Sequence, residues 1–435
     1  MSQTVYVCEK PSQAEDVAKA LGVVRKERGH YAVKGDTVVT WAIGNLFELA
    51  MPDVLDPKWR RWSWETLPIL PTKWQDLPVA GTKTQLEHIR SLLKDAKTAV
   101  IATDAGREGE LIGRKILEYA KFKGLILRLW TSSLTQTDLA VALKKLQPES
   151  ATRPLYHAAL ARQRADYLYG LTLTRAGTLG HGIPREVFPS GRVQTPTLGL
   201  IVERYADFMA FKSKAYFELE VPVCTEAGCE LVLAFAPGED DRVFSKEDIR
   251  RMAALLKNGE GSVKVTLASR QDQAPLPYSL PALQQAANKS HKLSAKDTLA
   301  AAQALYDAKY LTYPRTDCRH LAASQKGEVP AVLRAVETVD VPRVAKLATL
   351  GTVLRPELFD DAKLTDHHAI IPTREAPRFG SVVHEQVYRL VAAQYLRALA
   401  PAHKYDVANA SLLVEGVPLR AEHKRVTQEG WRALG

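Results

Sequence analysis

The sequence predicts a multidomain protein in which an α/β domain is combined with separate helical and β-rich parts. Its 435 residues are too many for one typical hydrophobic core, and 46% of them are hydrophobic, which is enough to fill several cores. Strand, turn and helix patterns alternate near the start of the chain, whereas alternating strand patterns and long helical patterns follow separately later. These changes of pattern divide the chain at 1–150, 151–211, 212–273, 274–403 and 404–435.

The α/β domain is predicted from two strand, turn and helix segments. In the first, "TVYVCEK" is a short buried strand, and the helix "SQAEDVAKALG" follows it. We expect a capping box of Ser12 and Glu15 to open this helix and Gly22 to close it. The second segment is a strand over 99–103, the turn "DAG" and a helix over 108–119.

Four charged residues follow the predicted strands directly. Glu9 and Lys10 come after the first strand, and Asp104 and Glu108 come after the second. Ligands of open α/β sheets bind at the carboxyl ends of the strands, so we expect these side chains to face one another in one site.

The remaining elements follow from periodicity and from helix-breaking residues. Helical spacing covers 156–210 around a Gly- and Pro-containing connection, and alternating patterns such as "AYFELEVPV" make 212–270 β-rich. A Pro-containing linker then precedes a helical part, in which Ser294 is an expected helix cap. The expected helices of this part are 279–290, 294–308 and 328–339, and the chain is strand-like again from 404.

Composition restricts the location and the partners. The formal net charge of +10 favours a polyanion such as nucleic acid as partner, although the same balance could serve solubility alone. There is no apolar run of about 20 residues and no secretion signal at the start, so we expect a cytoplasmic protein without a membrane partner. The four cysteines lack the spacing of a zinc site. Cys224 and Cys229 instead flank "TEAG", an expected hairpin turn with reduced thiols.

The segment "KYLTYPRTDCRHL" at 309–321 carries a candidate nucleophile. The phenol of Tyr313 and the guanidinium of Arg315, which can hold a phosphate by two hydrogen bonds, together suit attack on a phosphodiester. Taken alone, the pair is far more often that of a packed strand tyrosine beside a solvent-facing arginine. Evidence from other residues of the chain is needed to choose between the catalytic and the structural interpretation.

Several separated motifs together resemble the type IA DNA topoisomerases, and within them the topoisomerase III branch. "EKPSQA" and "TDAGREGE" are similar to the Toprim domain of that family, and "PSGRVQTPTLGLIVER", "LTYPRTDCRHL" and "DHHAIIPT" (366–373) are similar to its later signatures. The resemblance spans essentially the whole chain. It implies a toroidal architecture made of Toprim, helical base, β-rich arch and tyrosine domains, incomplete here because the family continues after "EGWRALG".

The resemblance also implies roles for individual residues. Tyr313 would attack single-stranded DNA to give a 5′-phosphotyrosyl intermediate, so that strand passage and religation need no ATP. Arg315 would hold the scissile phosphate, Lys10 would stabilise its developing charge, and Glu9 would protonate the leaving oxygen. His367 would also belong to the active site. The implied Mg²⁺ ligands are Glu9, Asp104 and Glu108, and the implied DNA contacts are Arg192, Gln194 and His368.

Two positions depart from the family pattern: Gly106 stands where a second acid is usual, and Asn45 where a histidine is frequent. The implied function is relaxation of negative supercoils, decatenation or both in a bacterial cytoplasm, at the nucleoid or a plasmid. A helicase or a single-strand-binding protein is a candidate partner. Two alternatives stay open, namely a metal-dependent Toprim-type nuclease and a single-stranded-DNA-binding fragment without strand passage.

Overall fold

The computed structural model of the protein describes residues 3–131, 134, 136–236, 242–365 and 367–435. Asp366, the first residue of the "DHHAIIPT" motif, therefore lies outside the described residues. The N-terminal unit is built on a seven-stranded sheet with the strand order β2-β3-β4-β1-β7-β8-β9. Its strands are β1 (Thr4–Cys8), β2 (Val23–Glu27), β3 (His30–Val33), β4 (Thr37–Trp41), β7 (Thr98–Ala102), β8 (Leu125–Arg128) and β9 (Gln147–Pro148).

Strand β1 lies at the centre of this sheet, parallel to β4 on one side and to β7 on the other. Strand β8 continues the parallel part beside β7, whereas β2, β3 and β9 pair antiparallel at the two edges. The central strands are buried on both faces, which explains why their sequences are continuous apolar runs rather than alternating ones.

Helices cover both faces of the sheet. On one face, α1 (Pro11–Leu21) and α5 (Gln136–Leu143) contribute to an apolar core that includes Val17 and Leu139. On the other, α3 (Lys83–Lys94) and α4 (Arg107–Tyr119) contribute Ile89 and Ile112 to a second core. A long extension between β4 and α3 contains β5 (Phe47–Leu49), α2 (Pro52–Leu55) and β6 (Asp76–Pro78).

The predicted strand is present but ends at Cys8 rather than at Lys10, the helix end at Gly22 is confirmed, and the predicted capping box is wrong. Helix α1 begins at Pro11 with Lys10 as N-cap. No side chain, that of Ser12 included, forms a capping hydrogen bond at its start. Proline suits the first helical position because its missing N–H would be unpaired there. Ser12 instead lies 3.5 Å from the hydroxyl of Tyr306, and Glu15 pairs with Lys19.

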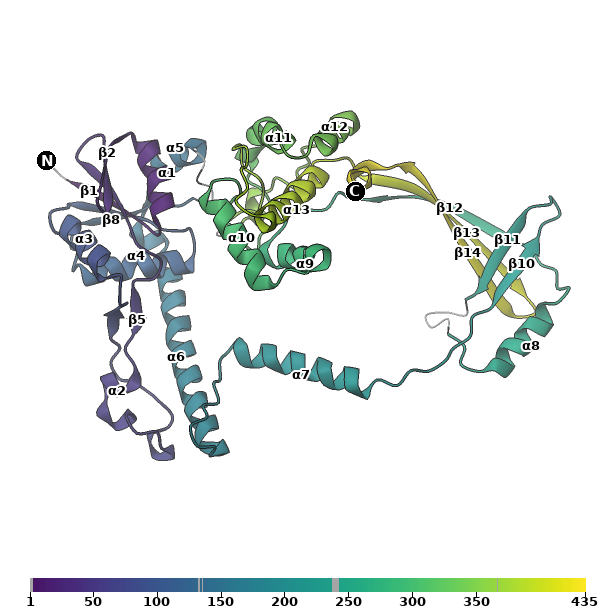
Figure 1. Cartoon of the computed structure of the whole chain (residues 1–435), viewed down its shortest axis with the longest axis horizontal. Helices are drawn as coiled ribbons and strands as arrows, with labels where there is room; N and C mark the ends of the chain where they lie inside the picture. Colours follow the sequence, from purple (N-terminus) through teal and green to yellow (C-terminus); the bar gives the residue numbers. More distant parts are fainter. Residues whose placement is uncertain (1–2, 132–133, 135, 237–241, 366) are drawn as a thin grey trace.

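Two long helices leave the N-terminal unit, as predicted for 156–210. Helix α6 (Arg153–His181) starts against α4, and α7 (Gln194–Ala210) follows a connection of twelve residues, 182–193. None of residues 194–210 is buried, although several are large and apolar, among them Leu200, Tyr205 and Phe208. Helix α7 therefore packs against little of the described chain (Figure 1).

The β-rich part forms a five-stranded antiparallel sheet, which we call the arch sheet, with the order β10-β11-β14-β13-β12. The exposed thiols of Cys224 and Cys229 flank the predicted hairpin turn and are not bonded to each other. Helix α8 (Lys246–Leu256), which the sequence analysis did not predict, covers one face through Met252. The strands are β10 (Glu220–Cys224), β11 (Glu230–Phe235), β12 (Lys264–Asp272), β13 (His403–Val414) and β14 (Val417–Gln428).

The helical part that carries Tyr313, called here the tyrosine unit, has its own apolar core around α13 (Val382–Ala398). The three helices expected from the sequence are present, with Ser294 capping α10 as predicted. Helices α12 and α13 were not predicted. Besides α13, the unit contains α9 (Leu280–His291), α10 (Ala295–Asp307), α11 (Val329–Glu337) and α12 (Val341–Leu350).

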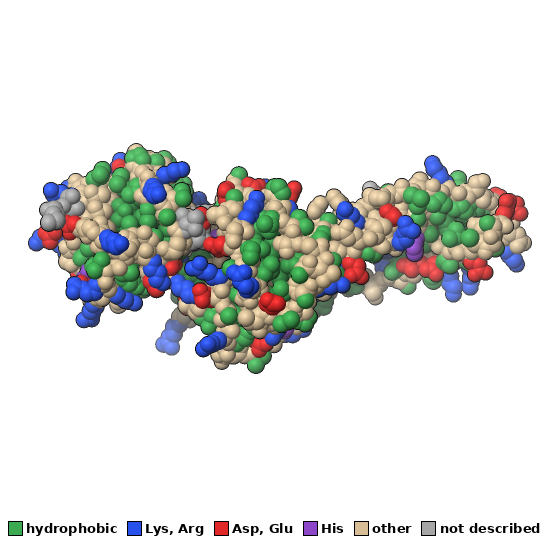
Figure 2. Space-filling model, turned by 90° about the horizontal axis from the view of Figure 1, so that it is seen from above, with side chains coloured by type: hydrophobic (Ala, Val, Ile, Leu, Met, Phe, Trp, Pro, Cys, Tyr) green, Lys and Arg blue, Asp and Glu red, His purple; other side chains and the backbone are tan. Residues whose placement is uncertain are grey.

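The units follow one another along a ring-shaped path. From the N-terminal unit the chain runs through α6 and α7 to the arch sheet and returns to the tyrosine unit, which lies beside the N-terminal unit (Figure 1). Lys and Arg side chains gather on the surface around that junction (Figure 2). Within the described residues, no helix combines the length and apolar character needed to cross a membrane.

Candidate active site

The site begins at the carboxyl ends of β1 and β7. Because these strands are parallel and Cys8 pairs with Ala102, the residues that follow them emerge side by side. The backbone N–H of Asp104 donates to Glu9 Oε2 at 3.2 Å. The side chain of Gln13 joins the two segments, since it accepts from the Glu9 N–H at 2.8 Å and donates to Asp104 Oδ1 at 3.0 Å. The expected meeting of the two strand ends is thus confirmed.

Asp104 is the centre of this arrangement. Lys10 Nζ lies 3.5 Å from Asp104 Oδ2, and Nε2 of His367, from the tyrosine unit, lies 3.2 Å from the same oxygen. Burial works to raise the pKa of Asp104, but the hydrogen bond from His367 and the charge of Lys10 outweigh it and lower the pKa. Asp104 is therefore a carboxylate.

Glu9 has the opposite electrostatic character. Burial, followed by the negative charge of Asp104, raises the pKa of Glu9 to about 7, against the opposing effect of Lys10. Two neighbouring carboxyl groups thus have pKa values that are pushed apart, one suited to carrying a proton near neutral pH and the other to staying ionised. Such a pair is typical of sites for acid-base chemistry.

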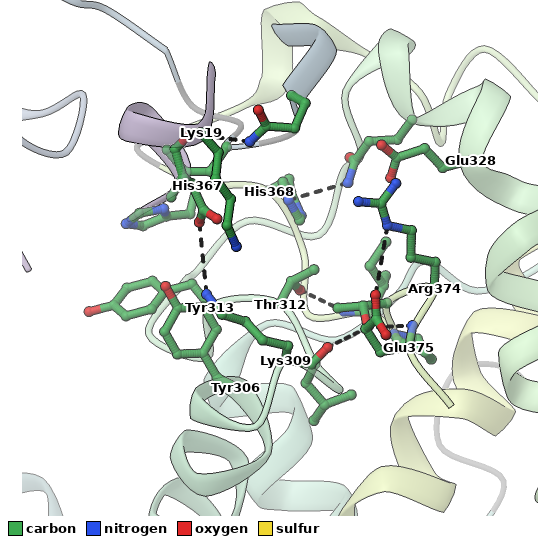
Figure 3. Close-up of a pocket in the computed structure, with 18 of the residues that line it drawn as sticks. Lys19, Tyr306, Lys309, Thr312, Tyr313, Glu328, His367, His368, Arg374 and Glu375 are labelled. Carbon is green, nitrogen blue, oxygen red and sulfur yellow. Dashed lines mark hydrogen bonds and ion pairs between the residues drawn. The ribbon is translucent and has the colours of Figure 1, made fainter. Parts of the chain in front are cut away.

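Tyr313 faces these carboxyl groups from the tyrosine unit. Lys10 Nζ lies 3.7 Å from the centroid of the Tyr313 ring, and the His367 ring centroid lies 4.4 Å from it. Tyr306 meets the same ring edge-on at 5.4 Å (Figure 3). Burial raises the pKa of the Tyr313 phenol, whereas the positive charge of Lys10 works against that rise.

An open cavity of about 570 Å³ lies on the carboxylate side of Tyr313. Arg315 is exposed in this cavity, two residues after the phenol, so phosphate held there would be within reach of both. The cavity lining includes Glu9, Asp104, Gly106, Arg107, Glu108, Trp130, Arg315, Asp317, Thr365 and His367.

A second cavity, of about 340 Å³, lies on the other side of Tyr313, between α1 and the tyrosine unit (Figure 3). Its wall includes His368, whose Nδ1 lies 2.8 Å from the Ala369 carbonyl oxygen and whose Nε2 lies 3.2 Å from Gln325 Nε2. A neutral ring that donates from Nδ1 and accepts at Nε2 satisfies both contacts. Burial lowers the pKa of His368 to about 4, in agreement with a neutral ring.

The carboxylates can be compared with the needs of a divalent metal. Glu9 and Asp104 offer hard oxygen atoms at the edge of one cavity, which suits Mg²⁺, because Mg²⁺ keeps several waters and completes its shell with substrate phosphates. Glu108 is turned toward α6, where its side chain forms an ion pair with Arg162. In the part of the chain that the structure describes, no three His, Cys, Asp or Glu side chains converge closely enough to enclose a metal. The residues fit a hydrated cation shared with substrate.

Glu110, two residues beyond Glu108, belongs to the interior. Its fully buried carboxylate accepts from the Arg114 Nε at 2.9 Å and also binds Arg128, which is itself fully buried. Arg128 in turn donates to the carbonyl oxygens of Thr103 and Asp104, at 2.9 and 2.7 Å. This network fixes the end of β7, and so the position of the Asp104 backbone.

A glycine allows α4 to start directly beside Asp104. A side chain at Gly109 would bring its Cβ to 2.1 Å from the Asp104 carbonyl oxygen, which no residue other than glycine can avoid. Gly106, where the family pattern has an acid, lies at the N-cap of α4 with an extended φ of −167°. Glycine is therefore not required there by the backbone.

Two predicted DNA-contact residues lie outside both cavities. Arg192 and Gln194 are located at the start of α7, and Arg192 forms two hydrogen bonds to the carboxylate of Asp166 on α6, at 2.5 and 3.1 Å. The structure thus brings the five predicted catalytic residues and Asp104 together, but not Arg192 and Gln194. Asn45 accepts from the Phe47 N–H at 3.2 Å and has a local structural contact.

Sequence reasoning missed four residues that complete the site: Gln13, Arg128, Arg162 and Tyr306. Gln13 had a detectable signal, since it lies four residues after Glu9, at the start of the predicted helix. A charged residue at the end of the apolar run "LILR" was the signal for Arg128. Arg162 and Tyr306 lie in helices of ordinary composition, so nothing local distinguishes them.

The comparisons with known proteins agree along the whole chain. A family model described as "Toprim domain" matches residues 4–134, and one described as "DNA topoisomerase" matches residues 150–435. The chain is 36% identical to DNA topoisomerase 3 of Bacillus licheniformis, covering 100% of this chain and 60% of that protein. It is 35% identical to DNA topoisomerase 3 of Vibrio cholerae, covering 99% of this chain and 70% of the relative.

A solved structure shows the same fold. Topoisomerase I from Thermotoga maritima aligns with a TM-score of 0.64 at 18% sequence identity, over 99% of this chain and 67% of that one. The chain spans about 60% of the length of the Bacillus relatives that it matches.

Proposed function

The chain belongs to the type IA DNA topoisomerase family, and from this premise we propose that it cleaves and reseals single-stranded DNA through a covalent bond to Tyr313. The observation that carries the proposal is the position of the Tyr313 ring. It lies against Lys10 and His367, and both of these residues contact Asp104 beside Glu9. A nucleophile, a lysine, an imidazole and an acid thus meet around Tyr313, beside a cavity that also contains Arg315.

In the proposed cleavage step, the Tyr313 oxygen forms a bond to phosphorus while the bond from phosphorus to the 3′-oxygen breaks. Glu9 gives its proton to the leaving 3′-oxygen, and the phenolic proton leaves to water. The raised pKa of Glu9, which burial causes, keeps that carboxyl protonated up to about neutral pH. Arg315 holds the scissile phosphate and Lys10 stabilises the charge on its oxygens. Religation reverses these steps without ATP, because the phosphotyrosyl bond keeps the energy of the phosphodiester.

We assign Mg²⁺ to the carboxylates of Asp104 and Glu108 and to the oxygen of Glu9 that does not carry the proton. The ion would supply positive charge next to the DNA phosphate and would reduce the repulsion between DNA and the acids. His367 would hold Asp104 in place from the tyrosine unit. His368, Arg192 and Gln194 remain proposed DNA contacts outside the carboxylate cavity.

At the level of the whole protein, we propose strand passage through the ring, with relaxation of negative supercoils, decatenation or both as the outcome. The contacts between the N-terminal unit and the tyrosine unit include polar pairs such as Ser12 with Tyr306 and Asp16 with Lys309, which can separate as strand passage requires. A helicase or a single-strand-binding protein would supply the underwound or single-stranded substrate.

The test is a search for a covalent adduct. Protein, Mg²⁺ and end-labelled single-stranded DNA are incubated and then denatured, and we expect labelled DNA attached to the protein through a 5′-phosphate, with a free 3′-hydroxyl on the other fragment. Cleavage products without attached protein would favour the metal-dependent nuclease instead. Binding without any cleavage would favour the single-strand-binding alternative.

The metal assignment has a test of its own. Replacing Asp104 or Glu108 by Ala should raise the Mg²⁺ concentration needed for rejoining more than it changes DNA affinity, because basic contacts dominate binding. Rejoining at limiting Mg²⁺ at the wild-type rate by both variants would show that the metal is held elsewhere.

A further inference from the structure

Arg162 forms the ion pair that holds Glu108 away from the other carboxylates. We propose that Arg162 exchanges Glu108 for the DNA backbone, so that occupation of Glu108 by a cation releases a phosphate-binding guanidinium at the edge of the active site. This inference rests on the proposed function, because it takes Glu108 as a metal ligand and single-stranded DNA as the substrate. It assigns to Arg162 a positioning role in the coupling of metal and DNA binding.

The geometry makes the exchange possible. Glu108 lies in the first turn of α4 and Arg162 on α6, which packs along α4, and the two side chains are paired. The exposed fractions are 52% for Glu108 and 39% for Arg162, so the pair contributes at most about 1 kcal/mol. A divalent cation or a phosphate can therefore replace either partner at low cost.

Glu108 also borders the cavity that contains Tyr313 and Arg315. Its partner Arg162 is thus anchored next to the place where the scissile phosphate is proposed to lie. Once released, the guanidinium needs only a change of side-chain rotamer to approach a neighbouring phosphate, and arginine can bind one by two parallel hydrogen bonds.

The next carboxylate on α6 does not compete for the released arginine. Asp166 lies one helical turn after Arg162 but already accepts two hydrogen bonds from Arg192. Hydrogen bonding from Arg192, helped by its charge, lowers the pKa of Asp166, so this carboxylate stays ionised and paired. Glu108, Arg162, Asp166 and Arg192 thus form a row of alternating charges from the active site along α6, in which only the first pair ends at the proposed metal site.

The proposal can be tested without metal and without catalysis, by a double-mutant cycle on DNA binding in EDTA. Glu108→Gln should release Arg162 as a cation would, and should tighten the binding of a fluorescent single-stranded oligonucleotide about fivefold, the effect of one charge-assisted hydrogen bond. In the Arg162→Gln background the same Glu108→Gln change should give little gain. The salt dependence of binding should also become steeper by about 0.7 for Glu108→Gln alone, the slope of one added contact to single-stranded DNA.

Arg153→Gln is the matched control. Arg153 lies on the same helix, is also exposed, and pairs with Glu149 rather than with a residue of the site. The Arg153→Gln variant measures the effect of losing one positive charge alone. The fivefold gain in DNA affinity caused by Glu108→Gln should therefore persist in the Arg153→Gln background. Arg162→Lys keeps the charge but not the fork of donors, and should retain part of the gain.

Isothermal titration with Mg²⁺ in the absence of DNA gives an independent readout. Arg162→Gln should tighten metal binding, because the competitor for Glu108 is removed, whereas Arg153→Gln should not change it. An equal gain from Glu108→Gln with and without Arg162 would mean that simple repulsion of DNA had been relieved, and would overturn the proposal. Metal affinity unchanged by Arg162→Gln would overturn it as well. Neither result would affect the adduct test of Tyr313, so failure of this inference and failure of the proposed function are distinguishable.

Discussion

Glu108 and Glu110 lie two residues apart on α4 and have opposite environments. Glu108 is half exposed and paired with one exposed arginine, whereas Glu110 is completely buried between Arg114 and Arg128. The first pair can be exchanged for a cation or a phosphate, since water screens both partners. The second cannot, because separating a buried pair leaves an uncompensated charge in the interior. The comparison teaches that one helix turn supplies both a replaceable ligand and the fixed support beneath it.

A similar contrast holds between the junction of the N-terminal and tyrosine units, which is polar, and the interiors of these units, which are apolar. The N-terminal unit and the tyrosine unit meet through polar contacts that include Asp104 with His367 at 3.2 Å, Ser12 with Tyr306 at 3.5 Å, Asp16 with Lys309 at 3.9 Å and Asp138 with Ser324 at 2.9 Å. Each unit has an apolar core of its own behind this contact. Changes at the junction should therefore alter chemistry and binding, and changes in the interior should alter stability.

The largest effect is expected at the junction, for Tyr313→Phe. The substitution removes one oxygen and keeps the ring against Lys10 and His367, so the covalent adduct should disappear while the melting temperature and DNA affinity stay close to those of the wild type. Adduct formation is measured on denaturing gels with labelled single-stranded DNA.

Tyr306→Phe is the control for that experiment. Tyr306 packs against Tyr313 but does not line the cavity that contains Arg315 and the carboxylates, so its hydroxyl should not act as nucleophile. We expect the adduct to persist in this variant. Cleavage by Tyr313→Phe at the wild-type rate would show that a metal-activated water is the attacking group.

In the interior, Glu110→Gln should produce the largest loss of stability. It leaves the fully buried Arg128 without its carboxylate and Arg114 with only its pair to Glu149, and breaking a buried pair of this kind costs about 3–5 kcal/mol. The expected result is a fall of about 10 °C in the melting temperature of the N-terminal unit, followed by circular dichroism. A variant that melts within 1–2 °C of the wild type would contradict the distinction drawn between the two glutamates.

The strand ends and the candidate nucleophile could be predicted from the sequence because their signals are local. Apolar runs identify β1 and β7, and parallel pairing then brings Glu9 and Asp104 together without further information. Ser294 at the start of α10 is likewise a local signal, since a serine before an apolar helix pattern can cap it by itself. The segment around Tyr313 is specific enough to be recognised by similarity.

The sequence-based predictions are wrong where residues far away in the chain determine the local structure. Ser12 and Glu15 have the spacing of a capping box, but Pro11 starts the helix one position earlier and Ser12 faces Tyr306 from another unit. The local sequence "REGE" does not indicate that Glu108 is exposed and Glu110 is buried. The burial of the two side chains depends on Arg128, on Arg114 and on the packing of α6. Helix α8 was missed because it is a short helix within a run of strand patterns.

A smaller effect on stability is expected when the pH is lowered, and it comes from His368 in the wall of the second cavity. The folded pKa of His368 is lowered by burial to about 4, below its value in an unfolded chain, so the unfolded state binds more protons between about pH 6.5 and pH 4. The stability that His368 contributes is complete above that window and is lost as the pH falls through it. We expect His368→Gln to reduce the loss of stability between pH 7 and pH 5 by about 2 kcal/mol, measured by urea unfolding. Identical pH profiles for the wild type and the variant would mean that His368 is accessible and charged in the folded protein.

The smallest effect on stability is expected for Glu108→Gln, and it completes the comparison with Glu110. The carboxylate is half exposed and its partner Arg162 is also exposed, so loss of the pair returns both groups to water and should change the free energy of unfolding by less than about 0.5 kcal/mol. Glutamine keeps the length of the side chain and the start of α4. Urea unfolding of this variant beside Glu110→Gln, in the same buffer, then measures the two environments against each other. A loss of more than 2 kcal/mol for Glu108→Gln would show that its pair with Arg162 supports the fold, and would remove the basis for treating that pair as exchangeable.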